Sequence, residues 1–207
     1  MTKISLVRHG LVHNPDEVYY GRLPGFRLAE LGRAQAAAAG DYLADAAVDA
    51  IYHSPMLRAY QTADILRSHC AATTQLAECT LLNEIHSPFD GRPVAEMEQR
   101  NWDFYHEVDA PFEQPEDIVA RIVRFFDLAR DRHPGRHVIG VSHADPIAFT
   151  IMWASGLPLA AEERKRLVEC GVSDGYPAPA SISTFTFAEG HAGELLEFRY
   201  HAPSVPR

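Results

Sequence analysis

Apolar positions along the chain fall into short runs that alternate with longer segments of helical periodicity. Residues 3–8 and 137–143 are largely apolar without a polar face, a pattern typical of strands buried on both sides of a sheet. Residues 48–54 and 74–82 are further short stretches of this kind. We predict a strand at each of these places.

Segments between and after these strands carry apolar residues at helical spacing and are predicted to be helices: Ala29–Asp45, 54–69, 115–132 and 145–156. In the second of them, Ser54 is a suitable N-cap and Pro55 suits the first helical position. Asp145 and Pro146 form the same pair at the start of the last one. The third is strongly amphipathic and stops before a Pro-Gly sequence, where helices commonly end.

The end of the chain returns to a strand pattern. Residues 180–187 and 193–201 are separated by Glu189–Ala192 and are predicted to form a β-hairpin. Residues 85–115, in contrast, carry several prolines and glycines. We expect this segment to be irregular, with one short helix near 94–104, and to cover a substrate site.

The alternation of strands and helices through about residue 155 determines the predicted fold class. It indicates an α/β protein in which a mainly parallel, mixed sheet is the middle layer of a three-layer α/β/α sandwich. No internal repeat and no linker divides the chain. We therefore expect residues 1–207 to form a single domain, a length that can bury a sizeable core.

Composition and charge exclude several classes of protein. Hydrophobic residues make up 46% and charged residues 23% of the chain, as in ordinary globular proteins. The formal charge of −9 argues against a nucleic-acid partner, because phosphate backbones attract basic surfaces. No apolar run approaches the roughly 20 residues of a membrane-spanning helix. The first residues do not resemble a signal peptide, so we expect a cytoplasmic protein without a membrane partner.

The cysteines give no sign of a disulfide framework or a zinc site. Cys70, Cys79 and Cys170 are widely spaced and form no C-x-x-C pair, which predicts reduced thiols. The sequence leaves the oligomeric state open, with a homodimer as one alternative.

Charged and ionisable side chains gather where the predicted strands end. The first strand ends in Arg8 and His9, and the strand at 137–143 ends in His143. Arg58 follows the second strand, and Glu84 follows the third. Ligands of such sheets bind outside the carboxyl ends of the strands, so we expect these side chains to share one edge of the sheet.

The motifs around these residues resemble those of the histidine phosphatase superfamily, whose fold is that of phosphoglycerate mutase. "VRHG" at 7–10 matches the family's R-H-G signature, and "SPMLRAYQTA" at 54–63 matches its S-x-x-x-R-A-x-Q-T-A segment. "NE" at 83–84 stands where the family has its acid, and "VSHADPI" at 141–147 matches the motif of its second histidine. The resemblance implies a phosphatase-type enzyme.

The resemblance also implies a role for each of these residues. His9 is the expected phosphorylated nucleophile, Glu84 the proton donor, and the phosphoryl group is bound by Arg8, Arg58 and His143. The chemistry is consistent, because guanidinium groups match phosphate oxygens and lower the pKa of a neighbouring imidazole. Fixed cations can also stabilise the charge of a phosphoryl transition state, so we expect neither a metal nor another cofactor.

Residues near these motifs are implied to bind the substrate: Asn14, Gly21, Arg22 and Ala144. The sequence departs from the family at Val12, Pro15 and Pro24, where Thr, Asn and Gln are usual. These departures indicate a distinct subgroup and make it unsafe to transfer a substrate by analogy.

Other histidines and aromatic residues have two interpretations. His13, His53, His86 and His106 could join the edge of the site, but their spacing matches no metal motif and favours surface or loop positions. The following aromatic residues could line a substrate pocket or could pack long loops onto the core: Tyr19, Tyr20, Phe89, Trp102, Phe104 and Tyr105.

The function that the sequence predicts is a metal-independent phosphatase that hydrolyses a small phosphorylated metabolite through a phosphohistidine. A cofactor-dependent mutase is the first alternative, but residues 85–115 lack the E-R-H-Y-G-type segment of the mutases. A non-catalytic regulator that binds a phospholigand is the second, suggested by the departures from the family motifs. The retained His9 and Glu84 argue against it, since binding alone requires neither. The physiological substrate is left open.

Overall fold

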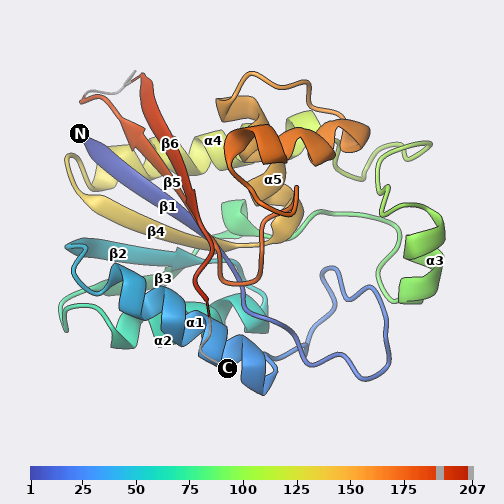
Figure 1. The fold of residues 1–207 in the computed structure, drawn as a ribbon, viewed down its shortest axis with the longest axis horizontal. Helices are drawn as coiled ribbons and strands as arrows, with labels where there is room; N and C mark the ends of the chain where they lie inside the picture. The colour runs from blue at the N-terminus through green and yellow to red at the C-terminus, as the bar shows by residue number, and fades with distance from the viewer. Residues whose placement is uncertain (190–193, 205–207) are drawn as a thin grey trace.

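A mixed sheet forms the centre of the computed structural model, which describes residues 1–189 and 194–204 (Figure 1). Within these residues the sheet has 6 strands in the order β3-β2-β4-β1-β5-β6. Their bounds are Thr2–Arg8 (β1), Val48–His53 (β2), Gln75–Glu78 (β3), His137–Ser142 (β4), Ile182–Phe187 (β5) and Leu195–His201 (β6). Strands β1 to β4 are parallel, whereas β5 and β6 are antiparallel to their neighbours.

Helices cover both faces of this sheet (Figure 1). Helices α1 (Glu30–Leu43) and α2 (Leu57–Ser68) pack on one face, while α4 (Pro115–Arg132) and α5 (Ala144–Ala154) pack on the other. Short elements complete the chain: η1 (Thr80–Leu82) and η2 (Ala161–Cys170), both 3-10 helices, and α3 (Val94–Gln99). The three-layer α/β architecture predicted from the alternation of elements is confirmed.

Strand β1 shows how the sequence produces the two layers. Side chains of a strand alternate between faces, and both faces of β1 are buried. Ile4 and Leu6 belong to the core under α4 and α5, whereas Val7 belongs to the core under α1 and α2. Each of these three side chains is 0% exposed, which explains why β1 lacks a polar face.

Two predicted helix caps are wrong. Helix α2 begins at Leu57 with Met56 as its N-cap, and Ser54 lies outside the helix, between β2 and α2. Helix α5 begins at Ala144, so Asp145 is inside its first turn. Both polar side chains are engaged in tertiary hydrogen bonds, described below, which local cap rules do not foresee.

Other boundaries differ less from the predictions. The third strand ends at Glu78, and η1 occupies the rest of the apolar run, while the predicted short helix is confined to α3. The hairpin β5–β6 is confirmed, but residues 190–192 of its expected turn lie outside the described residues. No helix within residues 1–189 and 194–204 is long and apolar enough to cross a membrane.

Parallel pairing of β1 and β4 places two histidines side by side. Arg8 pairs with Ser142 at the last position of both strands, and the backbone N–H of His9 donates to the Ser142 carbonyl over 3.0 Å. His143 follows Ser142 directly. The imidazoles of His9 and His143 lie with their ring centres 5.1 Å apart at the carboxyl edge of the sheet.

Candidate active site

The His9 ring is held so that one nitrogen is available as a base. Nδ1 donates to the Gly10 carbonyl over 2.8 Å, and Nε2 accepts from Arg58 Nε over 3.2 Å. Burial, the Arg58 charge and the Arg8 charge, in that order, hold the pKa of His9 well below its usual value. His9 is therefore a neutral imidazole with its lone pair on Nε2, the state that a nucleophile requires.

The turn after His9 depends on two glycines in close contact. A Cβ atom on Gly10 would lie 2.2 Å from the carbonyl oxygen of Gly32 in α1. The backbone N–H of Gly10 donates to Thr62 Oγ1 in α2 over 3.2 Å. Helices α1 and α2 thus fix the loop that carries His9, and a side chain at position 10 would push this loop away from α1.

Arg58 is fully buried and contacts three ionisable partners. Besides His9, its Nη2 lies 3.1 Å from His143 Nδ1 and 3.5 Å from Glu84 Oε2. The same Nη2 donates to the Gly21 carbonyl over 2.7 Å, and the guanidinium lies 4.7 Å from the centre of the Tyr20 ring. These contacts leave Arg58 little freedom and place a permanent positive charge at the centre of the site.

His143 is fixed from its other side by Ser54. The ring is 0% exposed, and its Nε2 lies 2.8 Å from Ser54 Oγ. Ser54 Oγ in turn donates to Asn83 Oδ1 over 3.3 Å, which joins the segment before Glu84 to the same network. Ser54, which we predicted to cap a helix, instead orients the second histidine.

Glu84 is buried beside Arg58 and His143. Its Oε1 accepts from the backbone N–H of Ile85 over 2.9 Å, and its Oε2 lies 3.3 Å from His143 Nδ1. Burial raises the pKa of this carboxyl to about 6, even though the Arg58 charge opposes the rise. A carboxyl with such a pKa can give and take a proton near neutral pH, as an acid–base catalyst must.

Arg8 presents a donor without a partner. Its Nη1 donates to the Pro177 carbonyl over 2.6 Å, and its guanidinium lies 5.6 Å from the centre of the Tyr176 ring. Its Nε is buried and has no hydrogen-bond partner. Buried charged donors without partners are rare in folded proteins, so this one indicates a place for an anionic ligand beside His9.

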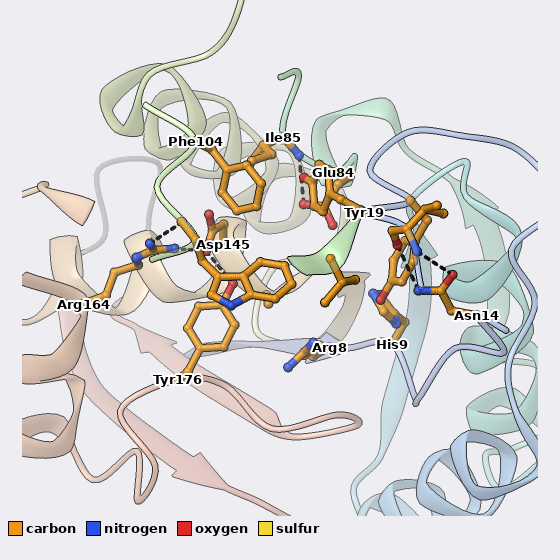
Figure 2. A pocket seen from close by; sticks show the side chains of 15 residues that line it. Arg8, His9, Asn14, Tyr19, Glu84, Ile85, Phe104, Asp145, Arg164 and Tyr176 are labelled. Atoms are coloured by element: carbon orange, nitrogen blue, oxygen red, sulfur yellow. Dashed lines mark hydrogen bonds and ion pairs between the residues drawn. The ribbon is translucent and has the colours of Figure 1, made fainter. Parts of the chain in front are cut away.

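A cavity of about 540 Å³ opens next to these residues. Figure 2 shows His9 and Asn14 at one end and Arg164 with Tyr176 at the other. Glu84 also lines the cavity, between its two ends. The volume exceeds what a phosphate group alone needs and is in the range of small-molecule sites.

The four predicted substrate-binding residues occupy different places. Asn14 and Ala144 line the cavity, although the Asn14 amide also pairs with the Val18 backbone at 2.9 and 3.3 Å. Gly21 offers its carbonyl to Arg58, and Arg22 donates to the Glu84 carbonyl over 2.8 Å. Neither Gly21 nor Arg22 lines the cavity. Direct contact of any of the four with a substrate stays a prediction.

The structure separates the aromatic residues into two groups. Tyr19, Tyr20, Trp102 and Phe104 line the cavity, whereas Phe89 and Tyr105 pack around it. The histidines whose position the sequence left open, His13, His53, His86 and His106, do not line it.

Three cavity residues were missed by the sequence analysis in this role. Asp145 accepts from Arg164 Nη1 over 2.8 Å and from the Tyr176 hydroxyl over 2.5 Å. Asp145 had been assigned only a capping role, and Arg164 and Tyr176 follow α5 without a motif or a strand end. No signal in the sequence points to these last two.

The ionisable cluster also meets a geometric condition for metal binding. Ligand atoms of His9, Glu84 and His143 lie within 4.8 Å of one another. However, the Arg58 guanidinium contacts all three of them. A fixed positive charge at this place repels a metal cation and attracts an anion such as a phosphoryl group.

The family assignment follows from comparison with known proteins. The model of the histidine phosphatase superfamily (branch 1) matches residues 4–188. The chain belongs to this superfamily. The family, together with the phosphatases among its relatives, indicates that this chain is a phosphatase.

Individual relatives agree with this assignment. An uncharacterized protein of Mycobacterium tuberculosis is 39% identical over 177 residues, which cover 80% of this chain and 84% of the relative. Phosphoserine phosphatase 1 of Hydrogenobacter thermophilus is 31% identical over 156 residues, 71% of this chain and 73% of the relative. The structure of a mycobacterial glucosyl-3-phosphoglycerate phosphatase superposes with a TM-score of 0.73 at 24% identity, covering 97% of each chain, and confirms the fold.

Proposed function

We propose that the protein is a metal-independent phosphomonoester hydrolase that transfers the phosphoryl group of its substrate to His9 and then to water. The observation that carries this proposal is the orientation of His9. Its Nδ1 is occupied by the Gly10 carbonyl, so that Nε2 is the only nitrogen left to attack, and Nε2 faces the Arg58 guanidinium. Glu84, the proposed proton donor, contacts the same guanidinium.

In the first step His9 Nε2 forms a bond to phosphorus while the ester P–O bond breaks. The leaving alkoxide takes the proton of Glu84, whose pKa of about 6 lets part of the population carry it near neutral pH. Arg58 and the unpartnered Nε of Arg8 stabilise the charge on the phosphoryl oxygens, while His143, which accepts from Arg58, holds that guanidinium in place. The products are an alcohol and a phosphohistidine.

In the second step water attacks the phosphohistidine. Glu84, now a carboxylate, takes a proton from the water, the P–N bond breaks, and inorganic phosphate leaves His9 as a neutral imidazole. The low pKa of His9, caused by burial and the two arginines, favours its departure without a proton. The cycle thus restores both residues to their starting states.

Transfer of the phosphoryl group to water, rather than to a second substrate, is supported by the relatives. The two named ones described above are phosphatases, of phosphoserine and of glucosyl-3-phosphoglycerate. A mutase would hold the phosphoryl group on His9 and exclude water. Efficient isomerisation of 3-phosphoglycerate, with a trace of bisphosphoglycerate and without release of phosphate, would reverse this preference.

The test is to trap the phosphoenzyme. Protein mixed with a ³²P-labelled phosphomonoester and quenched within milliseconds should carry a label that survives alkali and is lost in acid. His9→Ala should abolish the label and lower kcat by about 10⁴-fold or more, and the exposed His13 offers a matched control in His13→Ala, which should keep both. Turnover should persist in EDTA. Absence of the label, or its persistence in His9→Ala, would refute the proposal.

A further inference from the structure

The end of the cavity away from His9 has little free charge. Among the described lining residues the permanently charged cations are Arg8 and Arg164. Arg8 lies next to His9, where its Nε is left for the phosphoryl group. Arg164 pairs with Asp145 at 2.8 Å and is neutralised by it. A carboxylate on the substrate's leaving group would therefore meet no unpaired positive charge in this part of the cavity.

Asp145 is itself fully engaged and offers little to a polar substrate. Its side chain is 3% exposed and accepts from the hydroxyls of Tyr105 and Tyr176 at 2.6 and 2.5 Å, in addition to Arg164. This network fixes the Tyr176 ring in the cavity wall, where Figure 2 shows it facing the same space as Phe104. The surfaces that remain for a ligand here are mainly aromatic faces.

Trp102 is the most unusual of these aromatic residues. Its backbone has φ of 55° and follows Asn101 with φ of 51°, a left-handed conformation that is unfavourable for a bulky side chain. The Trp102 carbonyl accepts from Arg164 Nη2 over 2.7 Å, so the pair Arg164–Asp145 stabilises this conformation. The Trp102 side chain is not buried in the core, because Trp102 lines the cavity and is 39% exposed.

Residues held in sparsely populated backbone conformations cluster at active sites and at segments that contact ligands. Here the strain holds an indole at the cavity with part of its surface free. An indole offers a large flat apolar face, which stacks on other aromatic rings with a gain beyond simple burial. The free surface of Trp102 thus suits a flat ring on the ligand.

We propose that Trp102 stacks on the leaving group of the substrate, and that the substrates are phosphomonoesters whose alcohol carries an aromatic ring and no carboxylate. This inference rests on the proposed function, because the phosphoryl group has to be anchored between His9 and Arg8. The rest of the substrate then extends toward Tyr176 and Trp102, through a space of about 540 Å³ that accommodates a ring system.

Three phosphomonoesters test the proposed substrate class. All three release an aliphatic alcohol, so differences in their intrinsic reactivity should not dominate the result. Benzyl phosphate supplies an aromatic ring, cyclohexylmethyl phosphate supplies similar bulk without aromaticity, and 3-phosphoglycerate supplies a carboxylate. We expect kcat/KM to be about 10-fold higher for benzyl than for cyclohexylmethyl phosphate, and lowest for 3-phosphoglycerate. A preference for 3-phosphoglycerate would overturn the inference and leave the proposed function intact.

Variants of Trp102 assign the preference to the indole. Trp102→Leu should reduce the ratio of benzyl to cyclohexylmethyl kcat/KM to near 1, mainly through KM, and Trp102→Phe should restore part of it. Trp153 on α5 is similarly exposed, at 37%, but does not line the cavity, so Trp153→Leu should leave the ratio unchanged. An unchanged ratio in Trp102→Leu would overturn the assignment. If no substrate showed turnover that depends on His9, the proposed function would fail, and this inference with it.

Discussion

Two arginine–carboxylate pairs stand at the cavity, one beside His9 and one at the far end with Tyr176, and they are built differently. At the reaction end, Arg58 Nη2 lies 3.5 Å from Glu84 Oε2 and is shared with two other acceptors, the Gly21 carbonyl and His143. At the far end, Arg164 Nη1 lies 2.8 Å from Asp145, which also accepts from two tyrosine hydroxyls.

The difference separates a carboxyl that can change its protonation from one that serves as a fixed support. Glu84 has few donors and is buried, so its pKa is raised to about 6. Asp145 accepts three short hydrogen bonds, from Arg164, Tyr105 and Tyr176, and so ties together side chains from three different segments. An arginine–carboxylate pair thus supports catalysis at the reaction end and holds the cavity wall in place at the far end.

Between these two carboxyls, the largest expected effect is that of removing the exchangeable proton of Glu84. Glu84→Gln should lower kcat for an alkyl phosphate by about 10³-fold, because the leaving alkoxide loses its acid. The loss should shrink to about 10-fold for 4-nitrophenyl phosphate, whose leaving group needs no proton. Equal losses for both substrates, measured under saturating conditions, would show that Glu84 acts only in binding.

The raised pKa of Glu84 also makes this variant a test of stability. Folding raises the Glu84 pKa from 4.5 to about 6, so the folded state binds this proton more tightly, and the contribution of Glu84 to stability is largest below pH 4.5. Stability is lost as pH rises from 4.5 to about 6 and stays reduced above it, by up to about 2 kcal/mol. Glu84→Gln should therefore raise the unfolding free energy at pH 8, measured by urea titration, while activity falls.

Asp145→Asn should lower the unfolding free energy, where Glu84→Gln raises it, and should reduce activity less than Glu84→Gln does. Removing one charge of a buried pair leaves the other uncompensated, so we expect a loss of about 3 kcal/mol in unfolding free energy. The double variant with Arg164→Met should recover much of it, since a neutral apolar replacement of a buried pair is commonly tolerated. Urea titrations of the single and double variants measure the coupling, and additive losses would contradict this account.

The reaction end could be predicted from sequence because its residues sit on regular elements. His9 and His143 end β1 and β4, and Arg58 lies in the first turn of α2, so strand order and motif spacing place them at one edge. Even here, Ser54 was assigned to a helix cap, as Asp145 was at the far end. Their local sequence suits a cap, but distant partners engage both side chains, and tertiary contacts override local preference.

The far end could not be predicted, because distant segments without periodicity meet there. Arg164 reaches the Trp102 carbonyl across 62 residues of chain, and neither residue belongs to a motif. Trp102 adopts a left-handed conformation, although position 102 holds neither the glycine nor the asparagine from which such a conformation is predicted in a sequence. Sequence could name Trp102 only as one of several aromatic residues with two interpretations.

The smallest expected effect concerns Glu113, which connects residues 85–115 to the reaction end. Its carboxylate accepts from Arg22 Nη2 over 2.9 Å and from Arg121 Nε over 2.7 Å. Both arginines also approach the Glu84 backbone carbonyl, at 2.8 and 3.4 Å. Glu113 therefore acts on Glu84 indirectly, as a positioning residue that holds and neutralises the two cations beside it.

Loss of the Glu113 charge should shift the pH dependence of the reaction. With Glu113→Gln, the charges of Arg22 and Arg121 are no longer balanced and favour the ionised form of Glu84. Its pKa should fall, so the decline of kcat/KM with rising pH should begin at lower pH, with a loss of kcat of about 10-fold or less. The exposed Glu116 provides the control, because Glu116→Gln removes the same charge without touching this network. If Glu113→Gln lowered activity at every pH by the same factor, the residue would support the segment without tuning the proton donor.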